Sequence, residues 1–173
     1  HHPVIKQYLA GGKRVSYGAR AIAKGGLNSL PKMSFKGGLL LGCDAGTLNF
    51  AKIKGNHTAM KSGMLAAETV FAALQSEDGG GRDLTEYGQN VQQSWLFKEL
   101  HSSRNFGPAM HKFGTFWGGV FNTVEQNWFG GKLPFTLKDN NFDYAQMVLA
   151  SEATKIAYPK PDNIISFDRP TSV

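Results

Sequence analysis

Two glycine-containing segments carry the residue types best suited to binding a ligand through the backbone. Residues 37–46 read Gly-Gly-Leu-Leu-Leu-Gly-Cys-Asp-Ala-Gly, and residues 54–63 read Lys-Gly-Asn-His-Thr-Ala-Met-Lys-Ser-Gly. The pattern predicts a buried strand, a tight glycine turn and then the start of a helix rich in small residues. Unshielded N–H groups and the positive end of that helix would face an electron-rich ligand.

A flavin is one ligand that suits this arrangement, because its N1–C2=O edge becomes electron-rich when the ring is reduced. A helix N-terminus at that edge stabilises the reduced anionic form and raises the redox potential. Gly55 allows close approach, and Thr58 and Ala59 offer N–H groups in the first turn. Asp44, in the turn after the strand, can accept a hydrogen bond from a ribityl hydroxyl. Taken on their own, these residues still favour a plain strand–loop–helix unit over a ligand site.

The remaining reactive residues argue against several other chemistries. Cys43 is the single cysteine, so no internal disulfide can form and an iron–sulfur cluster would lack ligands. We expect it to be a small buried thiol. The histidines include no HExxH pair, so no metal site is expected, and His57 should cap or pack. Ser62 lacks the Gly-x-Ser-x-Gly setting of a hydrolase, and no catalytic residue is assigned.

Composition and charge narrow the class of protein. With 173 residues, 41% hydrophobic and 18% charged, the chain can bury a core and is not a disordered polyelectrolyte. The net charge of +6 fits an anionic membrane surface, an acidic partner or nucleic acid. The basic residues are scattered, which argues against nucleic acid. No segment reaches the roughly 18 to 20 uninterrupted apolar residues of a spanning helix.

The elements that would position the glycine segments can be read from hydrophobic spacing. Val15 and Tyr17 alternate with polar neighbours, which predicts a strand over residues 13–22. Residues 39–41 form a short apolar run between glycines, which is typical of a strand buried on both faces. Residues 58–74 should form a helix whose small apolar stripe lets it lie close to a sheet.

Two further helices are expected in the second half of the chain. The first should run from Thr85, its N-cap, to about residue 100, with Trp95 on its apolar face. Residues 104–108 should break the chain before the second helix, which spans residues 111–129. Its wide aromatic face and flanking lysines suit either a core helix or one lying in a membrane interface, and composition weighs the two evenly. The candidate membrane-facing residues are Phe113, Phe116, Trp117, Phe121 and Trp128.

The glycine segments, and residues 52–63 above all, resemble the electron transfer flavoprotein–ubiquinone oxidoreductases nearly residue by residue. The resemblance extends from residues 1–3 to residues 158–161. It implies an α/β (α+β) fold, with part of a glutathione-reductase-like FAD domain and an interfacial helical segment for membrane and quinone. The flavin-side residues that it implies are Gly42, Asp44, Gly46, Gly55, Thr58 and Ala59.

The same resemblance implies a division of the chain. Residues 1–36 would be the strand-rich part of a quinone or substrate domain, and residues 37–104 the C-terminal part of the FAD-binding domain. Residues 105–138 would be a membrane-associated helical segment. Residues 139–173 would be an extended linker towards a missing iron–sulfur domain, so the chain is expected to be an internal piece of a larger enzyme.

Two departures from the flavoprotein pattern bear on the site. Related flavoproteins often have Gly-Asp-Ala-Ala-Gly at the turn, whereas residues 42–46 read Gly-Cys-Asp-Ala-Gly, which displaces the acid by one position. No Gly-x-Gly-x-x-Gly follows an early strand, so the pyrophosphate half of an FAD site is not in this chain. We therefore expect one wall of a flavin site, and weak or no FAD binding by the chain alone.

By this resemblance, the intact enzyme would be an electron-transferring-flavoprotein dehydrogenase. It would pass electrons from reduced electron transfer flavoprotein through a [4Fe–4S] cluster and FAD to ubiquinone. The cluster ligands would lie outside this chain, which alone would be inactive. The enzyme would be monotopic, on the cytoplasmic face of a bacterial inner membrane or the matrix face of the mitochondrial inner membrane. The alternatives are another FAD-dependent oxidoreductase of the superfamily, such as a geranylgeranyl reductase or a nitrogen-fixation quinone reductase, and a non-catalytic module that binds membrane or a partner.

Overall fold

The computed structural model describes residues 2–13, 15, 18, 21–76, 81–139, 142–155 and 157. The chain divides into two compact units, one of His1–Ala21 with Asp143–Val173 and the other of Ile22–Phe142. In its described part the first unit contains helix α1 (Pro3–Leu9) and the 3-10 helix η3 (Asp143–Gln146). The second unit holds every residue of the candidate flavin and membrane segments, so the fold of this unit decides the function.

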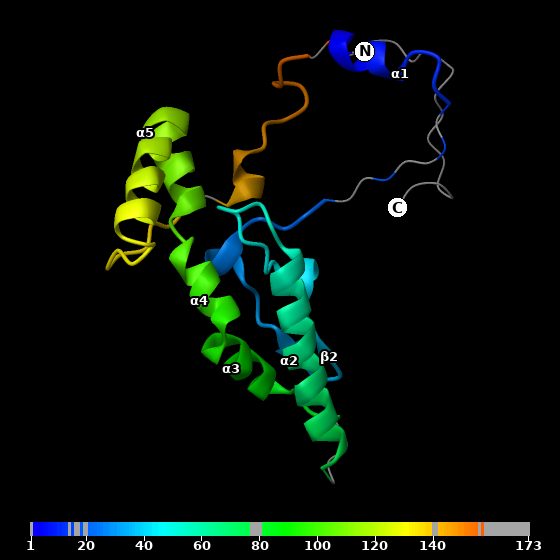
Figure 1. The fold of residues 1–173 in the computed structure, drawn as a ribbon, viewed down its shortest axis with the longest axis vertical. Coiled ribbons are helices and arrows are strands. Elements are labelled where there is room, and N and C mark those ends of the chain that lie inside the picture. The colour runs from blue at the N-terminus through cyan, green and yellow to red at the C-terminus, as the bar shows by residue number, and fades with distance from the viewer. Residues whose placement is uncertain are drawn as a thin grey trace. The chain divides into compact units, whose positions relative to one another are not determined.

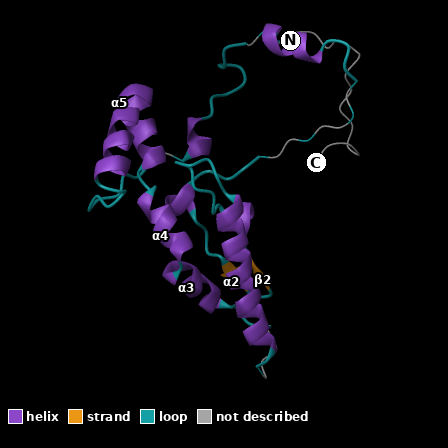
Figure 2. Cartoon of the chain, viewed as in Figure 1, coloured by secondary structure: helices purple, strands orange, loops and turns teal. Residues whose placement is uncertain are grey.

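The unit Ile22–Phe142 is mainly helical, and its described residues contain one small two-stranded sheet (Figures 1 and 2). Two 3-10 helices and the two strands precede the first long helix, and three more α-helices follow it. In chain order the elements are η1 (Gly26–Ser29), β1 (Ser34–Phe35), β2 (Gly38–Leu39), η2 (Gly42–Ala45), α2 (Asn56–Leu74), α3 (Thr85–Gln93), α4 (Trp95–Ser102) and α5 (Phe106–Trp128).

The structure has less strand than the sequence predicts. β1 and β2 are two-residue strands that pair antiparallel, with Ser34 opposite Leu39. The strand buried on both faces at residues 39–41 is therefore a wrong prediction, since Leu39 is half-buried and Leu41 is exposed. The reason is that β2 ends at Leu39 and belongs to a sheet of only two strands in the described part of the chain, which is too small to be covered by a packed layer on each face.

The strand expected over residues 13–22 is also not found where it can be checked. Positions 13, 15, 18, 21 and 22 have no regular secondary structure, and Val15 is almost fully exposed. Tyr17, its expected partner in the alternation, lies outside the described residues. Alternation over so few residues marks a strand only where a neighbouring strand is available to pair with it.

The helix predicted over residues 58–74 is confirmed as α2, which begins two residues earlier at Asn56. Its buried face packs on α3 and α4 and on the 3-10 helix η2. The core is formed by Met33, Ala45, Leu65, Ala66, Tyr87, Val91, Leu96 and Leu100. The small-residue stripe is only partly covered, because Ala67 and Val70 are exposed beside a hollow of about 540 Å³ next to β2.

The single helix predicted from residue 85 to about residue 100 is divided into α3 and α4. Ser94, between them, has extended backbone with φ −80° and ψ 165°, and it closes one helix and opens the next. Thr85 is the first helical residue instead of the N-cap, which is Leu84. The change of direction at Ser94 turns Trp95 outward and places Leu96 in the core, so the predicted position of Trp95 on the apolar face is wrong.

α5 begins at Phe106, directly within the residues expected to break the chain, and it consists of two helical arms. Gly114 has φ 69° and ψ −177° and separates residues 106–113 from residues 115–128. The continuous helix predicted over residues 111–129 is therefore wrong, although each arm is helical. The helical spacing of apolar residues continues across Gly114, so it does not reveal the break. The backbone conformation at the break is one that a glycine adopts readily. Figure 1 shows the two arms folded back beside each other.

The two arms of α5 approach each other through small residues. A Cβ atom on Gly118 would lie 2.7 Å from the carbonyl oxygen of Ala109 and 2.8 Å from the Cα atom of Met110. One turn further on, Asn122 Nδ2 donates a hydrogen bond of 3.0 Å to the carbonyl oxygen of Phe106. Later residues of the second arm thus meet earlier residues of the first, which makes α5 an antiparallel helical hairpin.

We expect Gly118→Ala to destabilise the chain by about 1–3 kcal/mol, because the added methyl group must push the two arms apart. Gly119→Ala is the matched control: it adds the same methyl group one position along, where no other atom lies within 4 Å. This control should be neutral or stabilising by up to ~1 kcal/mol, since alanine is the better helix former. Urea unfolding of both variants gives the comparison, and equal effects would contradict the close packing of the hairpin.

Candidate functional site

The turn Gly42–Ala45 and the beginning of α2 bring the predicted flavin-side residues into one region. The N–H group of Gly42 donates a hydrogen bond of 2.9 Å to Ser62 Oγ on α2. Gly42 has φ +61°, and a Cβ atom there would lie 3.3 Å from Cβ of Ala59. The positive φ and the close contact with the helix both explain why a glycine stands at this position.

The turn itself is fixed from the inside. Gly46 closes η2 in the left-handed conformation, with φ 78°, and its N–H group donates to the carbonyl oxygen of Cys43 at 3.0 Å. Thr47 donates to the carbonyl oxygen of Gly42 from both its N–H group and its hydroxyl, at 3.1 and 3.0 Å. Cys43 is a half-buried free thiol, and Asp44 is exposed at the surface of the turn.

The N-terminus of α2 offers backbone donors without a capping side chain. Gly55 is the N-cap residue, and no side chain bonds the first-turn N–H groups. Its carbonyl oxygen accepts from Ala59 N–H at 2.8 Å and from Thr58 Oγ1 at 2.9 Å, so both of these donors are used within the helix. The first-turn N–H groups that have no intrahelical acceptor belong to Asn56, His57 and Thr58.

The six flavin-side residues therefore lie in one region, but not all in the roles that the sequence indicated. The side chain of Thr58 is fully buried and anchors the helix start. The free backbone donors begin two residues earlier than predicted, because the helix begins earlier. Contact of any of the six with a flavin stays a prediction.

A polar cluster that the sequence patterns did not indicate is centred on Glu99 of α4. Its Oε1 atom accepts from Asn49 Nδ2 at 2.8 Å and from Lys52 Nζ at 3.2 Å, and it lies 2.8 Å from His57 Nε2. The ring of His57 stacks on Trp95, with centroids 5.9 Å apart and planes 4° from parallel. The expectation that His57 packs is thereby confirmed. The sequence signal was the four-residue spacing of Trp95 and Glu99, which puts both on one helix face.

The cluster has a defined effect on the ionisation of Glu99. Burial is the largest single influence and raises the pKa of its carboxyl group. The hydrogen bonds from His57, Asn49 and Lys52 together outweigh it and lower the pKa below the ordinary value of 4.5. The carboxylate form is thus favoured by its partners.

We expect the contribution of Glu99 to stability to be present above about pH 4.5 and to disappear at lower pH. The pKa is lower in the folded chain than in the unfolded chain, so the unfolded chain binds the proton first and the free energy of unfolding falls as pH falls. Urea unfolding of the wild type and of Glu99→Gln measures this contribution. The difference between them should shrink as pH falls from about 6 to about 3, and a constant difference would contradict the prediction.

A second cluster surrounds Arg104, which lies in the residues that the sequence marked only as a helix break. The side chain is 6% exposed and follows the end of α4. It donates to the carbonyl oxygens of His101, Gly131, Leu133 and Phe135 and to the hydroxyl of Thr136. One guanidinium group thereby joins the C-terminal end of α4 to the segment that follows α5.

The buried and exposed faces of α5 are the reverse of those of a core helix. Its buried residues are Ala109, Gly118, Asn122 and Glu125, all small or polar. Glu125 Oε1 accepts from Asn105 Nδ2 at 2.7 Å inside the hairpin. Most of the aromatic side chains face outward instead, with Phe116 72% and Trp128 81% exposed.

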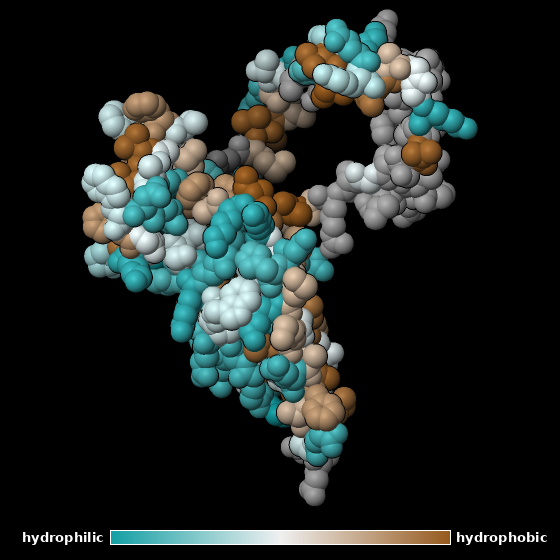
Figure 3. All heavy atoms as spheres, in the orientation of Figure 1, coloured by the Kyte–Doolittle hydropathy of each residue, from teal (hydrophilic) through white to brown (hydrophobic). Residues whose placement is uncertain are grey.

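Of the other predicted membrane-facing residues, Phe113 and Trp117 are exposed and Phe121 is half-buried. In Figure 3, hydrophobic atoms lie on the visible surface of the α5 hairpin among hydrophilic ones. None of the described helices combines the length and hydropathy needed to cross a bilayer.

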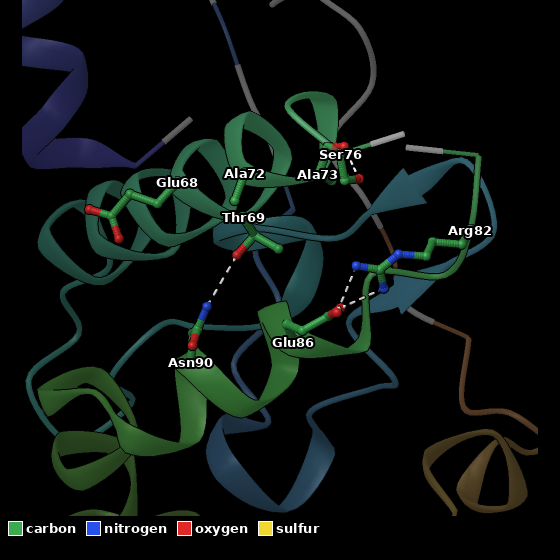
Figure 4. Close-up of a pocket in the computed structure, with 8 residues that line it drawn as sticks. All are labelled: Glu68, Thr69, Ala72, Ala73, Ser76, Arg82, Glu86 and Asn90. Atoms are coloured by element: carbon green, nitrogen blue, oxygen red, sulfur yellow. Dashed lines mark hydrogen bonds and ion pairs between the residues drawn. The ribbon is translucent and has the colours of Figure 1, made fainter. Parts of the chain in front are cut away.

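A small hollow between α2 and α3 is lined by residues of both helices and by Arg82 (Figure 4). Asn90 Nδ2 donates to Thr69 Oγ1 at 3.3 Å, and Arg82 pairs with Glu86 at 2.7 Å. Glu68 points away from these groups in Figure 4. Because Asn90 bonds to Thr69 and Arg82 pairs with Glu86, we assign this hollow to the packing of the two helices.

Known proteins resemble this chain over its whole length. No protein-family model matches it. The electron transfer flavoprotein–ubiquinone oxidoreductase of Pseudomonas aeruginosa is 64% identical over 173 residues, which is 100% of this chain and 31% of that protein. The chain belongs to the electron transfer flavoprotein–ubiquinone oxidoreductase family.

Other members of the electron transfer flavoprotein–ubiquinone oxidoreductase family agree with this assignment. The probable enzyme of Acinetobacter baylyi is 57% identical over 189 residues, covering 99% of this chain and 33% of the relative. The mitochondrial enzyme of Homo sapiens is 48% identical over 178 residues, covering 100% of this chain and 29% of the relative. The chain thus spans about a third of the length of the curated relatives that it matches.

Proposed function

We propose that this chain supplies one wall of the flavin site and the membrane-facing segment of an electron transfer flavoprotein–ubiquinone oxidoreductase. Such an enzyme passes electrons from reduced electron transfer flavoprotein, through an iron–sulfur cluster and FAD, to ubiquinone. The observation that carries the proposal is the 64% identity along the entire chain to the Pseudomonas aeruginosa enzyme of that name. A match of this kind favours this family over the geranylgeranyl reductases and the other flavoproteins of the superfamily.

The residues of the α2 N-terminus fit a flavin. The uncapped first turn presents N–H groups of Asn56, His57 and Thr58, and the positive helix end favours an electron-rich ring edge. Gly42 keeps the turn close to the helix, and Asp44 is exposed, where its carboxylate can accept a hydroxyl hydrogen bond. The flavin, when bound, supplies the one- and two-electron redox chemistry. The chain's part is to bind and orient it, within what we propose is a glutathione-reductase-like FAD domain.

The α5 hairpin supports a place at a membrane surface. Most of its aromatic residues are directed outward, while Asn122 and Glu125 each make a hydrogen bond inside, which suits a surface that meets lipid instead of water. Lys112, Lys132 and Lys138 are exposed and long enough to reach lipid phosphates. We propose a monotopic attachment, on the inner membrane of bacteria or of mitochondria, next to the ubiquinone that the enzyme reduces.

A chimaera tests the proposal directly. The segment of the Pseudomonas aeruginosa enzyme that matches this chain is replaced by the chain itself. We expect the purified chimaera to retain FAD, seen by its visible absorbance, and to reduce a soluble ubiquinone analogue, as the unmodified enzyme does. The 173-residue chain alone should bind FAD weakly or not at all, because it lacks the pyrophosphate-binding glycine motif.

The unmodified enzyme and a version lacking the segment are the controls. A folded chimaera without flavin would contradict the proposal and favour the non-catalytic module. Stoichiometric, tightly held FAD on the 173-residue chain alone would contradict the assignment of one wall only.

A further inference from the structure

We propose that Glu99 is a positioning residue for the flavin-facing N-terminus of α2. The inference rests on the proposed function, because it concerns the same flavin wall. Glu99 belongs to α4, not to the glycine segments, and nothing in its sequence position marks it as part of a ligand site. Its one carboxylate oxygen holds both the loop before α2 and the first turn of α2 itself.

The loop before α2 is a tight turn that needs support. The main chains of Asn49 and Lys54 bond each other in both directions, at 3.0 and 3.3 Å. Between them, Ile53 has φ +51° and is 76% exposed. A β-branched residue at positive φ is unfavourable and persists only where surrounding contacts enforce it. Glu99 provides such contacts, since it accepts hydrogen bonds from Asn49 and Lys52 on the same turn.

The turn leads directly into the helix start. Lys54 is followed by Gly55, whose carbonyl oxygen accepts hydrogen bonds from Thr58 Oγ1 and from the N–H group of Ala59. Whatever fixes the turn therefore fixes the orientation of Gly55 and of the N–H groups after it. Asn49 strengthens this link, because its Oδ1 atom also accepts the N–H group of Lys52 at 3.2 Å.

The first turn of α2 is held a second time through the ring of His57. Glu99 lies 2.8 Å from its Nε2 atom, and Trp95 stacks on its face. Trp95 and Glu99 are one turn apart on α4, so residues of a single helix face contact the His57 ring, Glu99 at its edge and Trp95 on its flat side. The backbone N–H of His57 is one of the three free donors, and these two contacts restrict its motion.

The test compares Glu99→Ala and Glu99→Gln with Glu68→Gln. The last removes the same charge from an exposed position on α2. In the 173-residue chain, Glu99→Ala should accelerate amide hydrogen exchange of Asn49, Lys54 and Ala59, whose N–H groups are hydrogen-bonded in the turn and at the helix start, by about tenfold relative to the amides of Leu65 and Ala66. Glu99→Gln keeps an acceptor oxygen for Asn49 and should recover part of the protection, while Glu68→Gln should match the wild type.

The second readout is the flavin in the chimaera. Glu99→Ala should weaken FAD retention by about tenfold and displace the flavin reduction potential, in addition to any fall in the melting temperature of the chimaera. Glu68→Gln should leave both unaltered. A role in stability alone would lower the melting temperature without moving the potential, which separates positioning from structural support. Should Glu99→Ala fail to fold, Glu99→Gln carries the same comparison with a smaller shift.

The possible failures are distinguishable. Unchanged exchange of the Asn49, Lys54 and Ala59 amides in both Glu99 variants overturns the positioning role of Glu99, whatever the flavin does. Faster exchange with an unchanged potential and unchanged FAD retention overturns the link to the flavin. If the chimaera without further substitution binds no flavin, the proposed function fails and the positioning role fails with it, while the exchange data still decide whether Glu99 holds the helix start.

Discussion

Replacing Arg104 with alanine is expected to lower the free energy of unfolding by about 3–5 kcal/mol. The guanidinium group is 6% exposed and bonds to four carbonyl oxygens and one hydroxyl, from His101 before it to Thr136 after α5. Without it, these acceptors remain in a region that water reaches poorly, and an unbonded buried acceptor costs about 1–3 kcal/mol. Urea unfolding followed by tryptophan fluorescence measures the loss.

Two further variants make the prediction specific. Arg104→Lys keeps the charge but replaces a planar set of five donors with three on one nitrogen, so it should restore only part of the stability. Lys98→Ala removes an exposed cation from α4, the helix that ends just before Arg104, and should change the free energy of unfolding by less than about 1 kcal/mol. Stability of Arg104→Ala within the range of Lys98→Ala would show that the carbonyl oxygens find other donors, and would contradict the role assigned here.

Replacing Phe116 and Trp128 together with aspartate is expected to abolish binding of the 173-residue chain to anionic lipid vesicles. These side chains are 72% and 81% exposed on the α5 hairpin. If they enter lipid, each aspartate removes apolar contact area and adds a charge that an interface rejects, so the bound fraction should fall at least tenfold, to about the level of the vesicle-free control. Vesicle flotation measures binding, and a thermal melt measures the fold.

The matched control is the pair Phe71→Asp and Leu74→Asp, which places two aspartates at exposed apolar positions on α2. This pair should leave vesicle binding intact apart from the change of net charge, which the α5 pair shares. A folded α5 variant that still floats with the vesicles would contradict the membrane role of the hairpin. An unfolded α5 variant would also contradict it, because it would show that the aromatic side chains belong to a core.

The fold was predictable where a local pattern is strong and its neighbours are supplied by the same segment. α2 is an example, since its small residues follow a glycine turn and its periodicity extends over five turns of helix. The strand at residues 39–41 was not predictable in the same way. A buried strand needs partners on both sides, and an apolar run carries no information about whether they are present.

The breaks in the helices were missed for a different reason. Ser94 and Gly114 are residues that a helix tolerates, and apolar spacing continues across both. What ends the helix is a backbone conformation that the surrounding packing selects, and a count of apolar positions does not contain it. The consequence was largest for Trp95, which lies on the outer side of α4 and packs on His57.

The residues of the candidate site also divide into those that a local pattern predicts and those that it does not. Gly42, Gly46 and Gly55 could be predicted because glycine itself signals a special backbone conformation or a close approach. Glu99 and Arg104 could not, because their partners lie on segments far away in sequence: Asn49 is 50 residues from Glu99, and Gly131 is 27 residues from Arg104. Only the fold brings these groups together.

The contacts that hold the α5 hairpin together lie in its interior, between its two arms. Its arms are joined by the bonds from Asn105 to Glu125 and from Asn122 to Phe106, and by the contact at Gly118. None of these depends on whether the outer surface meets water or hydrocarbon. If the hairpin attaches to a membrane as proposed, these contacts allow it to keep one shape in both solvents, and attachment would then need no refolding of the two arms.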